Sequence, residues 1–362
     1  MRILHTESSL GWGGQENRIL NEMIGLRALG HDMAVVSQPG ARIIDRAHEA
    51  GFPTYAVRMR TAVDIAAVLR LRAMMKEFRA DIVNCHSGRD TQLAGMAARS
   101  LGRQRPRIVR TRHLALPITS RFTYAILPDH VVTVSRFVAA YLASAGVPAD
   151  MITTVATGVD FSRYQASPDG SSLRTELGLA ADVPLIGTVA ILRRKKGHLD
   201  LLAAIPAVLQ RHPNAHFVFA GDGPIEQLVR AGIASAGLAD RVHMLGLRRD
   251  VVNVLQALDL FVLPTHQEAL GTAFIEAAAM GVAAIGTRVD GVPEVLADGE
   301  SGLLVPPHDS PALAAAINTL LDDPARRKAM GTAASQRIRR IYSREAMAEG
   351  MLALYARLLE RR

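Results

Sequence analysis

The sequence predicts an α/β fold made of two doubly wound parallel-sheet, Rossmann-like domains in series. Short apolar runs alternate with helical patterns along the whole chain, which is typical of parallel sheets covered by helices on both faces. A length of 362 residues is enough for two such domains, each burying its own core. With 49% hydrophobic and 21% charged residues, the composition is that of an ordinary folded protein.

The first half of the chain predicts seven strands with helices between them. The strands occupy residues 3–6, 33–37, 54–57, 82–85, 107–111, 131–134 and 152–155. Helical patterns cover residues 16–29, 63–78, 91–100 and 137–145. We expect the apolar residues of the 63–78 helix, Ile65, Val68, Leu69 and Leu71, to pack on their own sheet, with contact to a membrane interface as the alternative.

The second half repeats this pattern. Its strands are predicted at residues 185–190, 216–220, 242–245, 260–263, 283–286 and 303–305. Periodicity fades between residues 160 and 184, where Ser167-Pro-Asp-Gly-Ser-Ser172 is typical of turns. We therefore place a first domain at residues 1–165, a second at 166–342, and a final helical segment at 343–362.

Several classes of protein are excluded by composition. The longest apolar stretches are interrupted by Pro206 and Gly281 and fall short of the roughly 20 residues that span a bilayer. The N-terminus runs directly into a strand pattern, without a signal peptide. The single cysteine, Cys85, excludes an internal disulfide. Together these features indicate a cytoplasmic protein.

The net charge of +8 belongs to the first half of the chain. Residues 1–165 hold 21 Lys and Arg against 13 Asp and Glu, and the remaining residues are balanced. Nucleic acid, an anionic membrane and an anionic acceptor are the competing partners. With few aromatic residues and no nucleic-acid-binding signature, nucleic acid is the least favoured. The alternative is that arginine is simply the preferred surface cation, since the chain has four lysines.

Two glutamates flank a predicted helix start in the second half. Glu268 lies in the loop after a buried strand, and Glu276 lies about one turn inside the next helix. Between them, Gly271, Thr272 and Ala273 would present backbone N–H groups at the positive end of the helix dipole. The arrangement suits a phosphate flanked by hydroxyl groups, as in a nucleotide-sugar; a solvated face of the helix is the alternative.

Two further loops carry candidate residues. The first strand leads into Gly13, Gly14 and Glu16, and a glutamate at the third position of a dinucleotide fingerprint argues against a dinucleotide site. A purely structural glycine turn is the alternative. In the second half, four consecutive cations follow a strand, Arg193, Arg194, Lys195 and Lys196. Such a loop favours an anionic ligand, although a solvated basic loop is the alternative.

These segments together resemble the family-four retaining glycosyltransferases, which have the two-domain GT-B fold with a central cleft between the domains. The Glu-x7-Glu spacing of Glu268 and Glu276, the glycine loop, and Lys196 followed by Gly197 carry the resemblance. The turn glycines Gly221 and Gly223 also match. The family arginine position is Ile191 here, so Arg193 is its expected substitute.

The resemblance implies roles for these residues. Arg193 and Lys196 would neutralise the leaving diphosphate, Glu268 would bind the donor sugar, and Glu276 the ribose. The turn of Gly221 and Gly223 would lie beside the nucleotide, and the loop of Gly13, Gly14 and Glu16 would face the catalytic cleft. His113, at the end of the fifth strand, would bind a donor hydroxyl or phosphate, with a structural strand-end histidine as the alternative; His86 is a second candidate. The last segment would cross back onto the first domain.

The expected activity is transfer of a sugar, with retention, from a nucleotide-diphosphate sugar to a glycan or lipid-linked acceptor. A UDP-sugar is the expected donor, with no separate cofactor. No metal-binding cluster or Asp-x-Asp pair is visible, so we expect no metal. The resemblance places this activity in bacterial envelope polysaccharide synthesis at the inner membrane face. A nucleotide-sugar epimerase and a catalytically idle binding scaffold of the same architecture are the alternatives.

Overall fold

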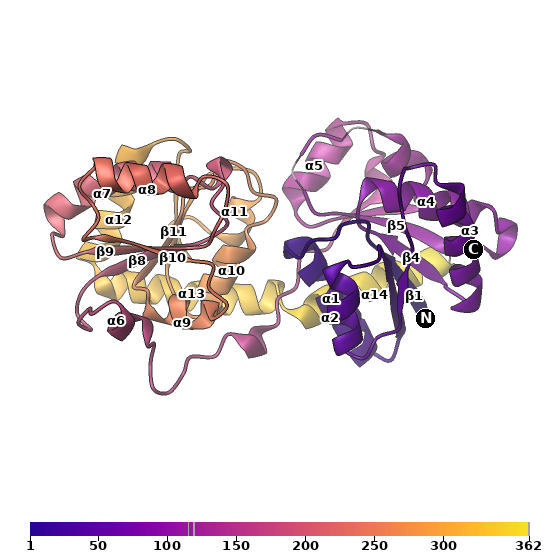
Figure 1. Cartoon of the computed structure of the whole chain (residues 1–362), viewed down its shortest axis with the longest axis horizontal. Helices are drawn as coiled ribbons and strands as arrows, with labels where there is room; N and C mark the ends of the chain where they lie inside the picture. Colours follow the sequence, from indigo (N-terminus) through magenta and orange to yellow (C-terminus); the bar gives the residue numbers. More distant parts are fainter. Residues whose placement is uncertain (115, 119, 361–362) are drawn as a thin grey trace. The chain divides into compact units, whose positions relative to one another are not determined.

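The computed structural model describes residues 1–114, 116–118 and 120–360, and it divides into two compact units (Figure 1). The first unit comprises Met1–Val159 together with Tyr342–Arg362, and the second comprises Asp160–Ile341. The change of unit therefore falls at Asp160, six residues before the start we expected. Residues 361 and 362 of the expected last segment lie outside the described residues.

The first unit is built on a seven-stranded sheet in the order β3-β2-β1-β4-β5-β6-β7, and every neighbouring pair is parallel. The strands are β1 (Arg2–Thr6), β2 (Asp32–Ser37), β3 (Thr54–Ala56), β4 (Ile82–Cys85), β5 (Arg107–Arg112), β6 (His130–Thr133) and β7 (Ile152–Thr154). The central strands are buried on both faces, which explains their continuous apolar runs.

Helices cover both faces of this sheet. They are α1 (Gly14–Ala28), α2 (Arg42–Glu49), α3 (Ile65–Glu77), α4 (Gly88–Arg99), α5 (Arg136–Ser144) and α14 (Arg344–Glu360). Ile3 packs with α1, α2 and α14, whereas its neighbour Leu4 packs with α3 and α4. Consecutive strand residues thus supply two separate cores, as the alternation of side chains along a strand requires.

The last helix, α14, lies beside α1 within the first unit (Figure 1). The Tyr355 hydroxyl of α14 donates a hydrogen bond to Glu22 of α1 at 2.7 Å, and both side chains are buried. Gly25 allows the close approach, because a Cβ there would lie 2.7 Å from the Ala348 Cβ. The end of the chain is therefore part of the first unit's core.

The second unit has a six-stranded parallel sheet in the order β10-β9-β8-β11-β12-β13. The strands are β8 (Leu185–Val189), β9 (His216–Ala220), β10 (Val242–Gly246), β11 (Leu260–Leu263), β12 (Ala284–Thr287) and β13 (Leu303–Val305). The prediction of two doubly wound parallel-sheet domains is confirmed.

The helices of the second unit again lie on both faces of the sheet. They are α6 (Leu173–Glu176), α7 (His198–Arg211), α8 (Glu226–Ser235), α9 (Val251–Ala257), α10 (Thr272–Ala279), α11 (Val292–Val295), α12 (Ser310–Asp322) and α13 (Pro324–Ile341). Leu260 and Val262 pack in the core with α7, α8 and α12. Phe261, between them, meets Phe274 of α10 edge-on at 5.6 Å between ring centroids.

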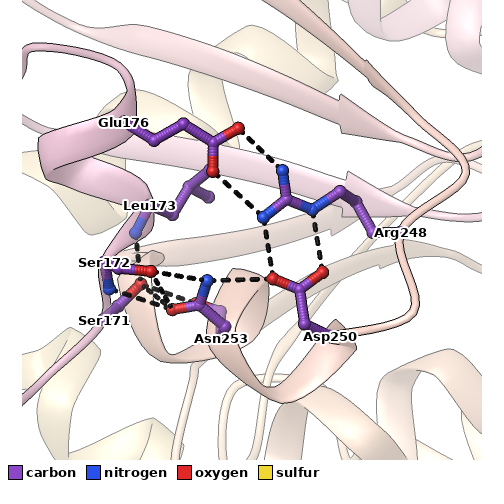
Figure 2. Close-up of polar contacts among 7 residues, drawn as sticks. All are labelled: Ser171, Ser172, Leu173, Glu176, Arg248, Asp250 and Asn253. Atoms are coloured by element: carbon purple, nitrogen blue, oxygen red, sulfur yellow. Dashed lines mark hydrogen bonds and ion pairs between the residues drawn. The ribbon is translucent and has the colours of Figure 1, made fainter.

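A network around Arg248 holds the start of the second unit onto its sheet (Figure 2). The Arg248 guanidinium donates to both carboxylate oxygens of Glu176, at 2.7 and 3.0 Å, and to both of Asp250, at 2.8 and 2.7 Å. Asn253 extends the network to Ser171 and Ser172. The turn-rich segment of residues 167–172 is therefore attached to the β10–α9 region.

The strand orders define one switch point in each sheet. In both sheets the order reverses once, between β1 and β4 and between β8 and β11. In open α/β sheets, ligands bind beyond the carboxyl ends of the strands at such a switch point. Within the described residues, no helix combines the length and apolar character needed to cross a bilayer.

Candidate active site

The switch point of the second unit joins Lys196 to Glu268. Lys196 follows β8, Glu268 follows β11, and the Lys196 ammonium donates to the Glu268 carboxylate. Both side chains are mostly buried, with 16% and 18% of their surface exposed. The two loops are also joined through the backbone, because Thr265 Oγ1 and His266 N donate to the Lys195 carbonyl at 2.8 and 2.7 Å. Two residues expected from separate motifs thus form one ion pair.

Gly197 allows these loops to meet. Its φ of 71° is left-handed, and a Cβ at this position would lie 1.8 Å from the Pro264 carbonyl oxygen at the end of β11. Only glycine fits both the conformation and the contact. The Lys-Gly pair therefore places the ammonium of Lys196 and starts α7.

The turn of Gly221 and Gly223 packs against the backbone of the segment that leads to the basic loop. A Cβ on Gly221 would lie 2.0 Å from the Ala190 carbonyl oxygen, and one on Gly223 would lie 2.5 Å from that of Leu192. Leu192 N also donates to the Asp222 carbonyl at 2.7 Å. In this structure both glycines pack against the loop that leads to Lys196.

The four cations of the basic loop differ in environment. Arg193 and Arg194 are exposed, whereas Lys195 and Lys196 are partly buried in the short turn Arg194–Lys196 (η5). Burial, followed by the charge of Lys196, lowers the pKa of Lys195. Lys196, rather than Arg193, contacts Glu268. The exposed Arg193 stays the predicted substitute for the family arginine, whose position is occupied by Ile191 in this chain.

The loop after β12 supports Glu268. Asp290 Oδ2 accepts a hydrogen bond from the Glu268 backbone N–H at 2.9 Å, and Gly291 N donates to the Glu268 carbonyl at 3.0 Å. Burial raises the pKa of Asp290. The loop after β12 therefore orients the backbone of Glu268.

Helix α10 begins at Thr272, with Gly271 as its N-cap and Ala273 as its second residue. Their N–H groups belong to the first turn, which lacks intrahelical partners. Glu276 lies one turn further on and accepts a hydrogen bond from Tyr164. Burial raises the pKa of Glu276, and the Tyr164 bond partly offsets this. No sequence pattern pointed to Tyr164, which precedes the turn-rich segment.

In the first unit, the Glu16 carboxylate accepts hydrogen bonds from two residues of the preceding glycine loop. Glu16 Oε2 accepts from the Gly13 N–H at 2.8 Å, and Oε1 accepts from Ser9 Oγ at 2.5 Å. The carboxylate is buried and caps the first turn of α1, which begins at Gly14. In this structure its contacts fix the shape of the loop.

Three histidines form a chain across the switch point of the first unit. His5 Nδ1 lies 2.9 Å from His86 Nε2, and His86 Nδ1 lies 2.9 Å from His113 Nε2. The residues come from β1 and from the loops after β4 and β5, three neighbouring strands. Burial lowers the pKa of all three, most strongly for His86 and His113. Both candidate histidines therefore belong to one neutral hydrogen-bonded chain.

Glu7 and Asp90 are buried carboxyl groups beside this chain that the sequence analysis missed. Burial, followed by the charge of Asp90, raises the pKa of Glu7 to about 8. Asp90 accepts from Thr6 Oγ1 at 3.0 Å and from the His86 backbone N–H at 2.8 Å. The position of Glu7, directly after the first predicted strand, was the signal that could have identified it.

The structure also shows a cluster that was not visible in the sequence, and it corrects one expectation about α3. No metal-binding cluster was visible in the sequence, yet Asp200, His266 and His308 come together in the second unit, with one ligand atom of each within 4.8 Å of the others. On α3, Leu71 is buried as expected, but Ile65 and Leu69 are 74% and 59% exposed. Their side chains point away from the sheet because they lie on the outer face of the helix.

Two protein families match the two halves of this chain. Residues 12–163 match the family model described as Glycosyltransferase Family 4, and residues 171–337 match the one described as Glycosyl transferases group 1. The first match falls almost entirely in the first compact unit, and the second match falls within the second unit.

Curated relatives match over part of their length. A GDP-mannose-dependent alpha-(1-6)-phosphatidylinositol monomannoside mannosyltransferase of Mycolicibacterium smegmatis is 31% identical over 215 residues, covering 57% of this chain and 56% of the relative. The lipopolysaccharide core biosynthesis mannosyltransferase LpsB of Rhizobium meliloti is 30% identical over 238 residues, covering 64% and 66%. The chain thus spans about half the length of the first of these relatives.

Solved structures match over nearly the whole chain. A glycosyltransferase from Rickettsia africae has a TM-score of 0.90 at 21% identity, covering 99% of both chains. Anabaena Alr3699/HepE, in complex with UDP and glucose, has a TM-score of 0.84 at 20% identity, covering 98% of this chain and 99% of that one. These similarities show that the chain has the two-domain GT-B fold, and its two halves match the family models described as Glycosyltransferase Family 4 and Glycosyl transferases group 1.

Proposed function

We propose that this protein is a retaining glycosyltransferase that moves a sugar from a nucleotide-diphosphate sugar to a hydroxyl of a glycan or lipid-linked acceptor. The observation that carries the proposal is the buried Lys196–Glu268 ion pair at the β8/β11 switch point. A cation, a carboxylate and the start of α10 there offer partners for a diphosphate and for sugar hydroxyls.

On the donor side, Lys196 and Arg193 would stabilise the charge that develops on the leaving diphosphate, with the N–H groups of residues 271–273. Such preorganised donors are the largest single contribution in many enzymes. Glu268 would bind the donor sugar, and Glu276 would accept hydrogen bonds from the ribose. Because cationic side chains and N–H groups supply this neutralisation, we propose that transfer does not depend on a metal.

In the first unit, His113 would bind a donor hydroxyl or phosphate through its Nδ1. Glu22 Oε1 lies 3.8 Å from His5 Nε2, so its charge favours a proton on that nitrogen. His5 Nδ1 then accepts from His86, and His86 Nδ1 accepts from His113 Nε2–H. The chain thereby leaves His113 Nδ1 as a hydrogen-bond acceptor.

The donor is the first point to test. The sequence favours a UDP-sugar, whereas the Mycolicibacterium relative is named as GDP-mannose-dependent. A thermal-shift screen across UDP-, GDP- and ADP-sugars identifies the nucleotide, since a ligand that binds only the folded state raises its apparent stability. Incubation of that donor with lipid-linked and free glycan acceptors, with and without EDTA, then identifies the product by mass spectrometry.

Each outcome of this experiment separates the alternatives. A glycosylated acceptor with a retained anomeric configuration, formed equally in EDTA, supports the proposal. Conversion of the donor sugar without any acceptor indicates an epimerase. Nucleotide-sugar binding with neither product indicates an idle scaffold, and loss of transfer in EDTA overturns metal independence.

We also propose that the protein works at the anionic inner face of the bacterial membrane, in envelope polysaccharide synthesis. Ile65 and Leu69 are exposed on α3, and a pocket of about 260 Å³ at the start of this helix is lined by Arg58, Arg60 and Arg70. Basic residues near an anionic surface each contribute about 1 kcal/mol, and apolar side chains beside them would enter the interface.

A further inference from the structure

We propose that Asp200, His266 and His308 form a binding site for a divalent transition-metal ion of the Zn²⁺ class in the second unit. Asp200 lies in the first turn of α7, His266 in the loop after β11, and His308 in the loop after β13. No two of them are close in sequence, so the site exists only in the folded chain. The inference does not depend on the transfer reaction.

The ligand atoms are already close to the geometry that such an ion requires. His266 Nε2 lies 2.6 Å and His308 Nδ1 lies 3.8 Å from Asp200 Oδ2. With metal–ligand bonds of about 2.0–2.2 Å, neighbouring ligand atoms around a tetrahedral Zn²⁺ lie about 3.3 Å apart. The shorter distance must widen and the longer one must shorten, each by well under 1 Å.

The exposed His308 side chain is free to make most of that adjustment. The His308 side chain is 66% exposed, whereas those of Asp200 and His266 are 20% and 22% exposed. Two imidazoles and one carboxylate form a set that favours Zn²⁺ and its neighbours over Mg²⁺ or Ca²⁺, which prefer oxygen ligands. Three protein ligands would leave a fourth position for water.

The backbone at His308 is an independent observation. Its φ is 60°, and in the described residues only Arg79 and Asp290 share a positive φ without being glycine. This conformation carries a cost for a side chain that glycine avoids. It places the His308 ring 3.8 Å from the His266 ring between centroids. The Asp200–His266 hydrogen bond alone requires neither this backbone nor this ring.

The site would connect the start of α7, the loop after β11 and the loop after β13, and the loop after β11 also carries Glu268. The His266 backbone N–H donates to the Lys195 carbonyl at 2.7 Å, and His266 precedes Glu268 by two residues. An ion held by α7, the β11 loop and the β13 loop would therefore stiffen the segment that carries Glu268.

The test is calorimetric titration of ZnCl₂ into the EDTA-stripped full chain, compared across variants. Wild type should bind one equivalent, and His308→Gly should weaken that binding at least tenfold. Glycine adopts the positive φ without strain, so this variant should keep or raise the melting temperature. Its loss of binding would then not reflect unfolding.

A matched control comes from a second histidine pair in the same unit. His216 Nδ1 and His243 Nε2 lie 2.9 Å apart, with Arg241 donating to His216 instead of a carboxylate accepting. His243→Ala should therefore bind Zn²⁺ as wild type does, and Asp200→Asn should lose it. The visible absorption of bound Co²⁺ should disappear in His308→Gly and Asp200→Asn and should persist in His243→Ala. The proposal is overturned if wild type binds no Zn²⁺, or if His308→Gly binds it with unchanged affinity.

Discussion

Lys196 and Glu268 come from separate loops and form one ion pair in the fold. Their pairing means that removing either charge leaves the other partly buried and unpaired, which is costly. Lys196 would also bind the leaving diphosphate, so its loss affects the transition state more than the bound donor.

Lys196→Ala is expected to lower kcat by about 10²–10³-fold, the usual loss for one transition-state donor. Glu276→Ala should mainly weaken nucleotide binding, because the ribose is bound in ground and transition state alike. Steady-state kinetics and calorimetry with the nucleotide measure the two effects. Lys328→Ala, an exposed lysine on α13, is the matched control. Full activity in both site variants would show that the site is elsewhere.

Tyr164→Phe is expected to strengthen nucleotide binding by about threefold to tenfold. The Tyr164 hydroxyl donates a hydrogen bond to the Glu276 carboxylate, so the ribose would compete with Tyr164 for this carboxylate. A hydrogen bond of this kind is worth about 1 kcal/mol net. The same change should lower the melting temperature slightly, since Glu276 loses its partner. Binding that weakens in Tyr164→Phe would instead assign Tyr164 to the nucleotide contacts.

Glu7 gives a pH dependence of stability. Its folded-state pKa is about 8, raised from an ordinary value of 4.5, so the fold favours the protonated acid. Stability should therefore fall as the pH rises from about 4.5 towards 8, and level off above it. Glu7→Gln should remove this component and melt higher than wild type at pH 9. A difference in melting temperature between wild type and Glu7→Gln that stays constant from pH 5 to pH 9 would contradict the assignment.

At the scale of elements, loops between strands and helices hold the candidate residues, and side-chain networks hold the loops. The Arg248 network attaches the segment before α6 to the β10–α9 region. Hydrogen bonds from Arg248 lower the pKa of Asp250 to about 2. The stability from this pairing is therefore present above pH 4 and is lost as the pH falls towards 2.

Arg248→Ala should lower the free energy of unfolding at pH 7 by about 1 kcal/mol, because solvent screens these partly exposed carboxylates. Arg230→Ala breaks an exposed pair with Glu226 within one helix and should cost about 0.3–0.5 kcal/mol. Urea denaturation at pH 7 and pH 3 compares the two variants. An Arg248→Ala effect that is as large at pH 3 as at pH 7 would refute the role of the carboxylates.

At the scale of the whole molecule, charge is divided between the two compact units. The first unit holds 24 Lys and Arg against 15 Asp and Glu, and the second holds 18 against 19. Several of the first unit's cations have internal partners: Arg105 and Arg107 pair with Asp129, and Arg110 and Arg112 are buried. The cations around the start of α3 remain exposed.

Sedimentation with liposomes should show binding that requires anionic lipid and fades as salt rises. Replacing Arg58, Arg60 and Arg70 by alanine should abolish it, because these residues surround the α3 pocket. Replacing three exposed arginines of the second unit, Arg230, Arg326 and Arg340, should leave it unchanged. Equal binding to neutral vesicles, or none to anionic ones at low salt, would favour a soluble acceptor.

Apolar patterns in the sequence were enough to predict the two parallel sheets and the succession of most strands and helices along the chain. This was possible because strands buried on both faces are written as continuous apolar runs, with turn residues between them. The positions of Lys196, Glu268 and Glu276 beside strand and helix ends followed from the same patterns.

Which of these residues contact one another became visible only in the folded chain. The Lys196–Glu268 pair, the chain of His5, His86 and His113, and the Asp200–His266–His308 cluster join residues that are distant in sequence. Parallel strands bring their carboxyl ends to one edge of the sheet, but strand order decides which ends are neighbours. That order is set by packing of the helices on both faces, which local sequence patterns do not encode.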